Sequence, residues 1–333
     1  MAYTTIDDPA QYFNTVIYTG TGSSNAVTGV GFQSNFIWIK SRSLSQDHKL
    51  HDTVRGTNGG YYESLRSNSD VASDVAADGA ADNTGMSAIG SDGFTVVSND
   101  SHNKSSATYA AWCWKEDATA GFDIVSYTGN DSNRTISHSL SAVPHWMMFK
   151  ARSRTDSWRV YHHKNTSAPA TDYLVLNTTD ATSDNATEFQ DTAPTSSVFT
   201  LGTSGNVNRN SETFVAYLWS EVKGFSKFGS FVGSGSGNGA GPFIYTGFKP
   251  AWIMIKQSST SGAGWRMHDT KRGISGNPED ETLYASANNA ESTGRDVDFL
   301  SNGFKLRTDS GDGNTSGSTY IYMAFAESPF VNS

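Results

Sequence analysis

The sequence predicts an all-β protein made of three tandem antiparallel repeats of about 105 residues, each organised like a β-sandwich or jelly roll. The main observation is a nine-residue segment that occurs three times, at residues 108–116, 213–221 and 319–327. Each copy begins with Thr and an aromatic residue, continues through aliphatic and aromatic residues, and ends with Glu. This composition is typical of a β-strand that is buried on both faces. We therefore expect a core strand at the end of each repeat.

Three further landmarks keep the same order in every repeat, at intervals of 104 to 110 residues. They are a short opening element, an apolar strand that ends in lysine, and a turn that leads into a strand through Phe. Their copies are 18–20, 127–129 and 231–233 for the opening element, 36–40, 146–150 and 252–256 for the apolar strand, and Phe94, Phe199 and Phe304 for the turn. Self-similarity of this kind indicates an internal triplication.

The landmarks also set the expected boundaries. We expect a leader at 1–11, followed by sandwich repeats at 12–116, 122–221 and 227–330. The joins between repeats are about five residues long, which is too short to let the repeats move independently. The repeats should therefore pack into a stiff rod or close into a ring with pseudo-threefold symmetry.

Composition supports a globular β-protein and argues against several classes of partner. The 333 residues are 36% hydrophobic and only 17% charged, and much of the remaining polarity comes from Ser, Thr, Asn and Gly, which favour turns and strands over helices. A net charge of −9 argues against a nucleic-acid surface, which needs clustered Lys and Arg. No apolar run approaches the ~20 residues of a membrane helix, so we expect no membrane insertion. The amino-terminal residues lack the pattern of a signal peptide, so we expect assembly in a cytoplasm.

Two polar stretches and the single cysteine have simple structural interpretations. Residues 67–83 are rich in Ser, Asp, Ala and Gly, which predicts a surface loop. The glycine-rich residues 233–241 are interpreted as a flexible hairpin tip, because the other repeats have Thr-Gly turns at that place. Cys113 lies between two tryptophans of the first core strand, so we expect a small buried hydrophobic side chain and no disulfide within the chain.

A His-Asp motif is the strongest candidate for chemistry. Residues 50–56 (LHDTVRG) and 267–273 (MHDTKRG) match closely, and the middle repeat has YHHK at 161–164. Adjacent residues on a strand point to opposite faces, so this His and Asp cannot form the hydrogen-bonded pair of a catalytic triad. We expect Asp and Arg to stabilise a turn between strands, and a polar binding site is the alternative.

The sequence lacks other signatures of catalysis or metal binding. The pair His162 and His163 does not have zinc-site spacing, and residues 309–317 lack the Glu that completes a calcium loop. No pair of glycosidase carboxylates stands out, and the 233–241 segment leads into a strand instead of the helix of a phosphate-binding loop. We therefore predict no metal, no cofactor and no enzymatic activity. The lysines that close the apolar strands should extend to solvent; they are Lys40, Lys150 and Lys256.

Several segments carry a resemblance that covers essentially the whole chain. They are 1–9 (MAYTTIDDP), 12–13 (YF), 18–22 (YTGTG), 126–130 (SYTGN), 191–199 (DTAPTSSVF), 225–229 (FSKFG), 299–306 (FLSNGFKL) and 320–330 (YIYMAFAESPF). In these segments the chain resembles a family of triplicated proteins of marine tailed bacteriophages. The resemblance brings no catalytic residues. It implies a structural protein of the virion, associated with the tail or fibre, whose partners are other virion proteins.

The leading hypothesis is a surface-exposed virion protein that adheres to a host receptor or glycan. Aromatic side chains on loops would make the contact, and the candidates are Tyr61, Tyr62, Trp158 and Trp265, although such residues are also typical of a core. The alternative is a decoration or cement protein on the phage head that binds no ligand. A glycan-degrading enzyme is a remote third hypothesis. The chain could also form homo-oligomers.

Overall fold

The computed structural model describes residues 4–73, 85–237, 239–273, 276–309 and 311–329. In these ranges the chain forms antiparallel β-sheets and a few short helices, so the predicted all-β class is confirmed. No helix in these ranges is long and apolar enough to cross a membrane.

One sheet recurs in each repeat with the same strand order. In the first repeat the order is β1 (Phe13–Thr19), β9 (Thr108–Trp114), β3 (Phe36–Ser41) and β4 (Lys49–Asp52). In the second repeat it is β10 (Phe122–Thr128), β17 (Thr213–Trp219), β12 (Trp146–Ala151) and β13 (Arg159–His162). In the third repeat it is β18 (Ser226–Val232), β25 (Thr319–Pro329), β20 (Phe248–Gln257), β21 (Arg266–Asp269) and β22 (Leu283–Tyr284). The strand that closes each repeat in sequence therefore lies inside its sheet, between the opening strand and the apolar strand.

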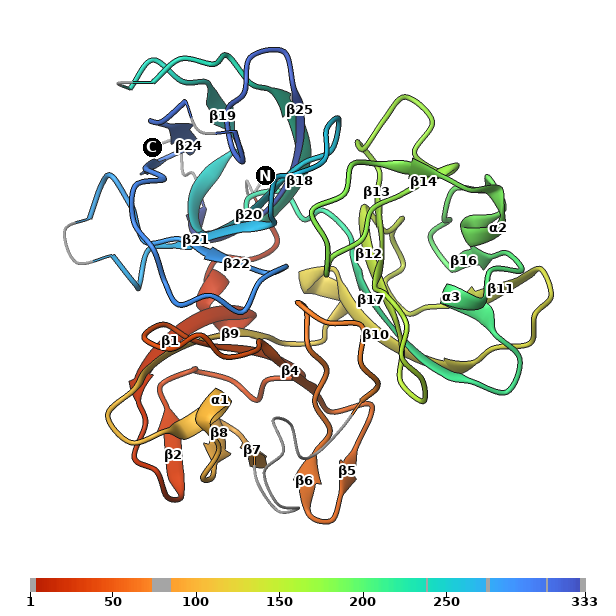
Figure 1. The fold of residues 1–333 in the computed structure, drawn as a ribbon, viewed down its shortest axis with the longest axis horizontal. Coiled ribbons are helices and arrows are strands. Elements are labelled where there is room, and N and C mark those ends of the chain that lie inside the picture. The colour runs from red at the N-terminus through yellow and green to blue at the C-terminus, as the bar shows by residue number, and fades with distance from the viewer. Residues whose placement is uncertain (1–3, 74–84, 238, 274–275, 310, 330–333) are drawn as a thin grey trace.

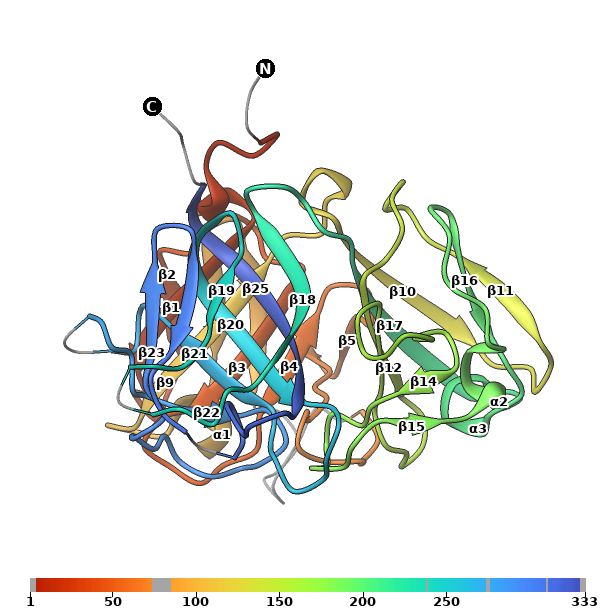
Figure 2. The same cartoon turned by 90° about the horizontal axis from the view of Figure 1, so that it is seen from above.

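A smaller sheet forms a second layer over the outer face of each main sheet. These sheets consist of β2 (Asn25–Thr28), β8 (Gly93–Val96) and β7 (Met86–Gly90), then β11 (Arg134–Ser137) and β16 (Val198–Leu201), then β19 (Phe243–Tyr245), β24 (Gly303–Leu306) and β23 (Val297–Leu300). Figure 2 shows β11 and β16 on the outer side of the second repeat, away from the other two repeats. The predicted Phe landmarks lie in β8, β16 and β24, and each points into the core between its two sheets.

The remaining elements are short. Two strand pairs join β5 (Thr57–Asn58) to β6 (Tyr61–Tyr62) and β14 (Asp172–Tyr173) to β15 (Ser183–Asp184). The helices are η1 (Pro9–Gln11), α1 (Asp100–Asn103), η2 (Ala118–Ala120), α2 (Ala186–Phe189) and α3 (Gly205–Asn208).

The core strands are buried on both faces, as their composition predicts. On β17, Phe214 and Leu218 face the core between the two sheets of the second repeat. Tyr217 and Trp219 face the opposite way, into a core shared with the other repeats. Cys113 is fully buried on β9, and burial raises the pKa of its thiol to about 12, so it is the expected inert hydrophobic side chain.

The common core joins all three repeats. It contains all eight tryptophans of the chain, and Figure 1 shows the three repeats around a common centre. Ring centroids lie 4.6 Å apart for Phe36 and Tyr217, 5.8 Å apart for Trp146 and Trp265, and 5.0 Å apart for Phe13 and Phe325. Each repeat thus contacts both of the others, which a linear rod would not allow.

The opening element of each repeat brings two backbone segments into close contact. A Cβ on Gly20, Gly129 or Gly233 would lie only 2.1, 2.1 or 2.2 Å from the carbonyl oxygen of Lys104, Arg209 or Thr315. Only glycine can occupy such a position. The described part of 233–241 is not a hairpin tip, because it crosses from β18 in one sheet to β19 in the other. It packs against the segment before β25, where Gly235 N donates to Asn314 O at 2.9 Å.

The lysines at the ends of the apolar strands do not reach solvent, and the expectation for them is wrong. Lys40, Lys150 and Lys256 are fully buried, and their ammonium groups donate to backbone carbonyls. Lys150 Nζ donates to Asp70 O at 3.1 Å, and Lys256 Nζ donates to Thr179 O at 3.2 Å. These acceptors belong to the preceding repeat, so packing of the preceding repeat against the strand end is what buries the charge. Of the predicted loop at 67–83, residues 67–73 contain no helix or strand, and 74–83 lie outside the described residues.

Candidate binding site at the junctions between repeats

The Asp and Arg of the His-Asp motif stabilise a buried turn, as predicted. Arg55 Nε donates to Asp52 Oδ2 at 2.5 Å, and Arg55 N donates to Asp52 Oδ1 at 2.7 Å. The third repeat reproduces both contacts, at 2.6 and 3.0 Å, between Arg272 and Asp269. All four side chains are fully buried. Burial alone would raise the pKa of Asp52, but the Arg55 charge and the Tyr217 hydroxyl outweigh it and hold this pKa below its usual value.

The histidine of the motif points to the other face of the strand. His51 Nε2 lies 2.8 Å from Nε2 of His102, in the outer part of the first repeat. Burial lowers the pKa of His51 to about 3, so the ring is neutral near pH 7. His51 and Asp52 therefore have separate hydrogen-bond partners on opposite faces of the strand and do not form a hydrogen-bonded pair.

Each motif carboxylate also contacts another repeat. Tyr217 of the second repeat donates its hydroxyl to Asp52 Oδ2 at 2.6 Å. Trp112 of the first repeat donates its indole N–H to Asp269 Oδ2 at 2.9 Å. The buried turns are thus part of the contacts that hold the repeats together.

A backbone hydrogen bond recurs at the three junctions, which we call first (repeats one and two), second (two and three) and third (three and one). The donors are Ser73, Thr182 and Glu291, and the acceptor carbonyls belong to Arg152, Ser258 and Arg42, at 2.8, 2.9 and 2.8 Å. The acceptor is always the second residue after the buried lysine. The three junctions therefore have equivalent backbone geometry, and their side chains can be compared position by position.

Two of the four predicted ligand contacts, Trp158 and Trp265, lie at these junctions and are not on exposed loops as expected. Trp158 and Trp265 are fully buried, and their indole N–H groups donate to the carbonyls of Arg66 and Val175 at 2.8 and 2.9 Å. His48 holds this position at the third junction, 2.9 Å from Tyr284 O. Because the neighbouring repeat covers these side chains, a ligand at a loop end would not contact them.

Ion pairs fill the first and third junctions. At the first, Arg152 Nη2 lies 3.3 Å from both Glu63 Oε2 and Arg55 O. At the third, Glu291 pairs with Arg42 at 2.7 Å and with Arg272 at 2.8 Å, and Arg42 Nη2 donates to Arg272 O at 3.1 Å. Two arginines and one glutamate thus occupy the space between neighbouring repeats.

The second junction lacks this filling and contains a pocket instead. Asn165 stands where Arg55 and Arg272 stand, and Ser258 stands where Arg42 and Arg152 stand. These shorter side chains leave a cavity of about 610 Å³, which we call the junction pocket. It is lined by seven hydroxyl side chains with Lys164, Asn165 and Ala181; the hydroxyls belong to Thr166, Ser167, Thr182, Ser230, Ser258, Ser259 and Thr319.

Hydrogen bonds connect the polar side chains on one wall of the pocket. Thr182 Oγ1 donates to Asn165 Oδ1 at 2.8 Å, and Lys164 N donates to His162 Nδ1 at 3.0 Å. The His162 ring replaces the motif aspartate and lies 3.3 Å from Tyr322 O of the third repeat. Hydroxyl, amide and ammonium groups can each exchange hydrogen bonds with a polar ligand. Among the residues that the structure describes, those that line the pocket include no carboxylate and no imidazole.

The two candidate tyrosines lie elsewhere. Tyr61 and Tyr62 form β6 in the first repeat, are half-buried, and do not line the junction pocket; their predicted contact with a ligand stays a prediction. Sequence reasoning missed an exposed pair on β19, Phe243 and Tyr245, which are 46% and 56% exposed. Comparison of the repeats would have found this pair, because the corresponding strand in the first repeat has the small residues Ala26 and Thr28.

Within the described ranges, no three His, Cys, Asp or Glu residues are arranged to hold a metal ion. In the segment that resembles a calcium loop, the Asp312 carboxylate already accepts a hydrogen bond from Arg295 Nε at 3.1 Å. A cation held there would face that positive charge at close range.

Comparison with known proteins places the chain in a family. No curated protein and no solved structure matches it. A family profile described as a domain of unknown function, DUF7483, matches residues 8–329, which include all three core strands and all three junctions. The chain therefore belongs to the DUF7483 domain family.

Proposed function

We propose that this chain is a surface-exposed structural protein of a tailed-bacteriophage virion that adheres to a host-cell glycan through the junction pocket. One observation carries the glycan part of the proposal. Of three junctions with equivalent backbone geometry, two are filled by arginines and a glutamate, and the second presents short hydroxyl and amide side chains around an open cavity. Packing alone does not require this difference, because the same backbone accepts the filled arrangement twice.

The chemistry of the lining favours a polyhydroxylated ligand. A sugar carries several hydroxyl groups that both donate and accept, and Ser, Thr and Asn side chains do the same. A cavity of about 610 Å³ lies within the usual range for small-molecule sites. Water would otherwise hydrate these walls, and sugar hydroxyls can replace its hydrogen bonds.

The virion part of the proposal is supported by the resemblance to tailed-bacteriophage proteins and by the properties of the chain. The net charge of −9 would keep the protein away from packaged DNA. The three repeats share one hydrophobic core, which suits a particle component that acts without disulfides.

The glycan proposal is tested by refilling the pocket. Ser258→Arg introduces the side chain that the chain itself uses at positions 42 and 152, so the fold should tolerate it. On a glycan array, we expect the unmodified chain to bind a defined set of glycans and the S258R variant to lose at least about tenfold in affinity. Ser132→Arg, at an exposed position of the second repeat, adds the same charge away from the pocket and should bind like the unmodified chain.

Equal binding by all three proteins, or no binding to any glycan, would reject the junction pocket as the adhesion site. Thermal unfolding of both variants shows whether a loss of binding reflects a loss of folding.

The position on the particle is tested by immunogold labelling of intact virions with an antibody to this chain. Label at the tail is the expected result. Label over the head would replace adhesion by decoration as the main role, and the absence of label from every virion would reject both.

A further inference from the structure

A second pocket lies next to the junction pocket. It has a volume of about 450 Å³, and we call it the arginine pocket. Adjacent residues line the two cavities. Ser258 lines the junction pocket and Gln257 lines the arginine pocket. In the same way, Thr319 lines the junction pocket and Ser318 lines the arginine pocket. The other residues that line it are Thr260, Ser261, Gly262, Ala263, Arg295, Gly311, Asp312 and Thr315.

The arginine pocket is open because one loop of the third repeat has only small residues. In the first repeat, Gln46 of the corresponding loop accepts a hydrogen bond from Ser101 Oγ at 3.3 Å. In the second repeat, Arg154 Nη1 lies 3.7 Å from the position that a Cβ on Gly205 would take. A long side chain thus reaches the segment before the last strand in both repeats. The third repeat has SSTSGAG at residues 258–264, and nothing in that loop can reach as far.

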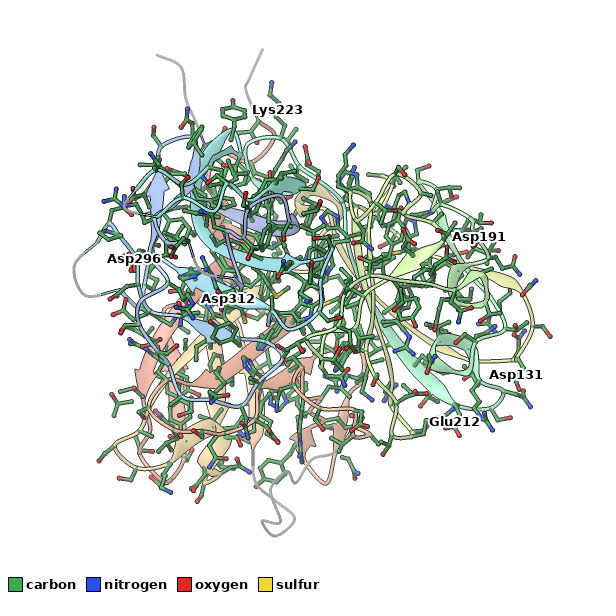
Figure 3. All side chains as sticks on the ribbon, turned by 45° about the horizontal axis from the view of Figure 1, so that its top comes forward. Asp131, Asp191, Glu212, Lys223, Asp296 and Asp312 are labelled. Carbon is green, nitrogen blue, oxygen red and sulfur yellow. The ribbon has the colours of Figure 1, made fainter. Side chains whose placement is uncertain are left out.

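One arginine and one aspartate line the arginine pocket, and a second, buried arginine lies close to the same aspartate. Arg295 Nε donates to Asp312 Oδ1 at 3.1 Å, and its side chain remains 40% exposed. The buried Arg266 has its Nη1 3.5 Å from Asp312 Oδ1. The Tyr284 hydroxyl donates to the same carboxylate, and burial and Asp312 raise the pKa of Tyr284 to about 12, so the phenol adds no charge near pH 7. Figure 3 shows Asp312 in the third repeat, away from Asp131, Asp191 and Glu212 of the second.

An exposed guanidinium held by a carboxylate is a preorganised site for an anion. Asp312 fixes Arg295 through Nε, which orients the guanidinium plane. Guanidinium groups bind carboxylates in the same plane through paired N–H donors. The Gln257 amide and the Ser and Thr hydroxyls around it suit the hydroxyl groups of a sugar.

We infer that the arginine pocket is a subsite for a carboxylate-bearing sugar, of the uronic-acid type. The subsite rests on Arg295, Asp312 and the small loop alone. The further conclusion that the host glycan is acidic, with one sugar in each of the two pockets, rests on the proposed function.

The test uses D-glucuronate and D-glucose as probes, with binding followed by ligand-observed NMR. We expect the unmodified chain to bind glucuronate at least about tenfold more tightly than glucose, as loss of a charge-assisted hydrogen bond would predict. Arg295→Gln should remove this preference. Arg307→Gln changes another arginine with a 41% exposed side chain, paired with Asp298, and should keep it.

The outcomes separate this inference from the proposed function. If the unmodified chain shows no preference for glucuronate, or if R295Q keeps the preference, the inference is wrong. The S258R variant should keep the preference, because its change lies in the junction pocket. Retention of glucuronate binding together with an empty glycan array would leave the subsite established and reject adhesion through the junction pocket.

Discussion

The indole N–H of Trp112 donates a 2.9 Å hydrogen bond to Oδ2 of Asp269, across 157 positions of sequence. Trp112 lies on the core strand of the first repeat, and Asp269 ends a strand of the third. The same oxygen accepts from Arg272 Nε at 2.6 Å. One carboxylate therefore balances a buried guanidinium and joins the two ends of the triplicated chain.

Loss of the Asp269 charge should destabilise the whole protein. Asp269→Asn leaves Arg272 buried with one fewer compensating charge, and breaking a buried pair in this way costs about 3–5 kcal/mol. We expect the free energy of unfolding, measured by urea denaturation, to fall by this amount. Glu327→Gln is the control, because the Glu327–Lys249 pair is exposed and should contribute less than about 1 kcal/mol. Similar losses for both variants would contradict a special role for the buried carboxylate.

Gly129 should not tolerate a side chain. A Cβ there would lie 2.1 Å from Arg209 O, and this backbone contact cannot move without displacing the segment before β17. We expect Gly129→Ala to lower the free energy of unfolding by about 1–3 kcal/mol or more. Gly205→Ala, in the same repeat, meets nothing closer than 3.6 Å and should cause no loss. Thermal unfolding of the two variants side by side gives the comparison.

The buried Lys150 should make stability rise with pH in the alkaline range. Burial lowers its pKa to about 8, from an ordinary value of 10.5. Between these values the unfolded chain binds more protons than the folded chain, so raising the pH favours folding. We expect the increase in unfolding free energy from pH 8 to 9.5 to be smaller in Lys150→Met, by up to about 1.4 kcal/mol per pH unit.

The control for this measurement is Lys249→Met, a change of a lysine whose side chain is 39% exposed. Parallel pH profiles for the unmodified chain and K150M would show that Lys150 is not buried as described.

His163 should contribute to the loss of stability in acid. It hydrogen-bonds Phe228 O of the third repeat through Nε2, at 2.8 Å. Burial lowers its pKa to about 4, and the neighbouring His145 and Lys164 act in the same direction. Between pH 6.5 and 4 the unfolded chain therefore takes up a proton that the folded chain does not, and stability falls as the pH falls.

His163→Gln keeps a donor to Phe228 O but cannot be protonated. We expect the difference in bound protons between unfolded and folded chain, obtained from the pH dependence of urea unfolding in this window, to fall by up to one. His138→Gln, outside the junctions, is the control. An unchanged proton difference in H163Q would mean that His163 is charged in the folded protein.

Much of the fold could be predicted because its signals are local. The repeated segment predicts β9, β17 and β25. Successive side chains of a strand point to opposite faces, so an uninterrupted apolar run makes both faces of these strands apolar. The predicted turn role of Asp52 and Asp269 is confirmed, because a carboxylate three residues before an arginine can reach it within one turn. The candidate site was predictable only in part. The departures at Asn165 and Ser258 are visible in the sequence, but their proximity is not.

By itself the sequence determined the all-β class, the segment that recurs three times and which strands are buried on both faces. These properties follow from periodicity and composition within single strands. Only the tertiary structure decided which repeat packs against each face of a main sheet. Neighbouring repeats cover Trp158, Trp265 and the strand-end lysines, and no signal within a single strand predicts this. The tertiary structure also decided where a pocket opens, because Asn165, Thr182, Ser230 and Ser258 meet only when two repeats pack together. Short side chains leave a cavity only if the residues that face them across the junction are also short, and those residues belong to another repeat, far away in the sequence.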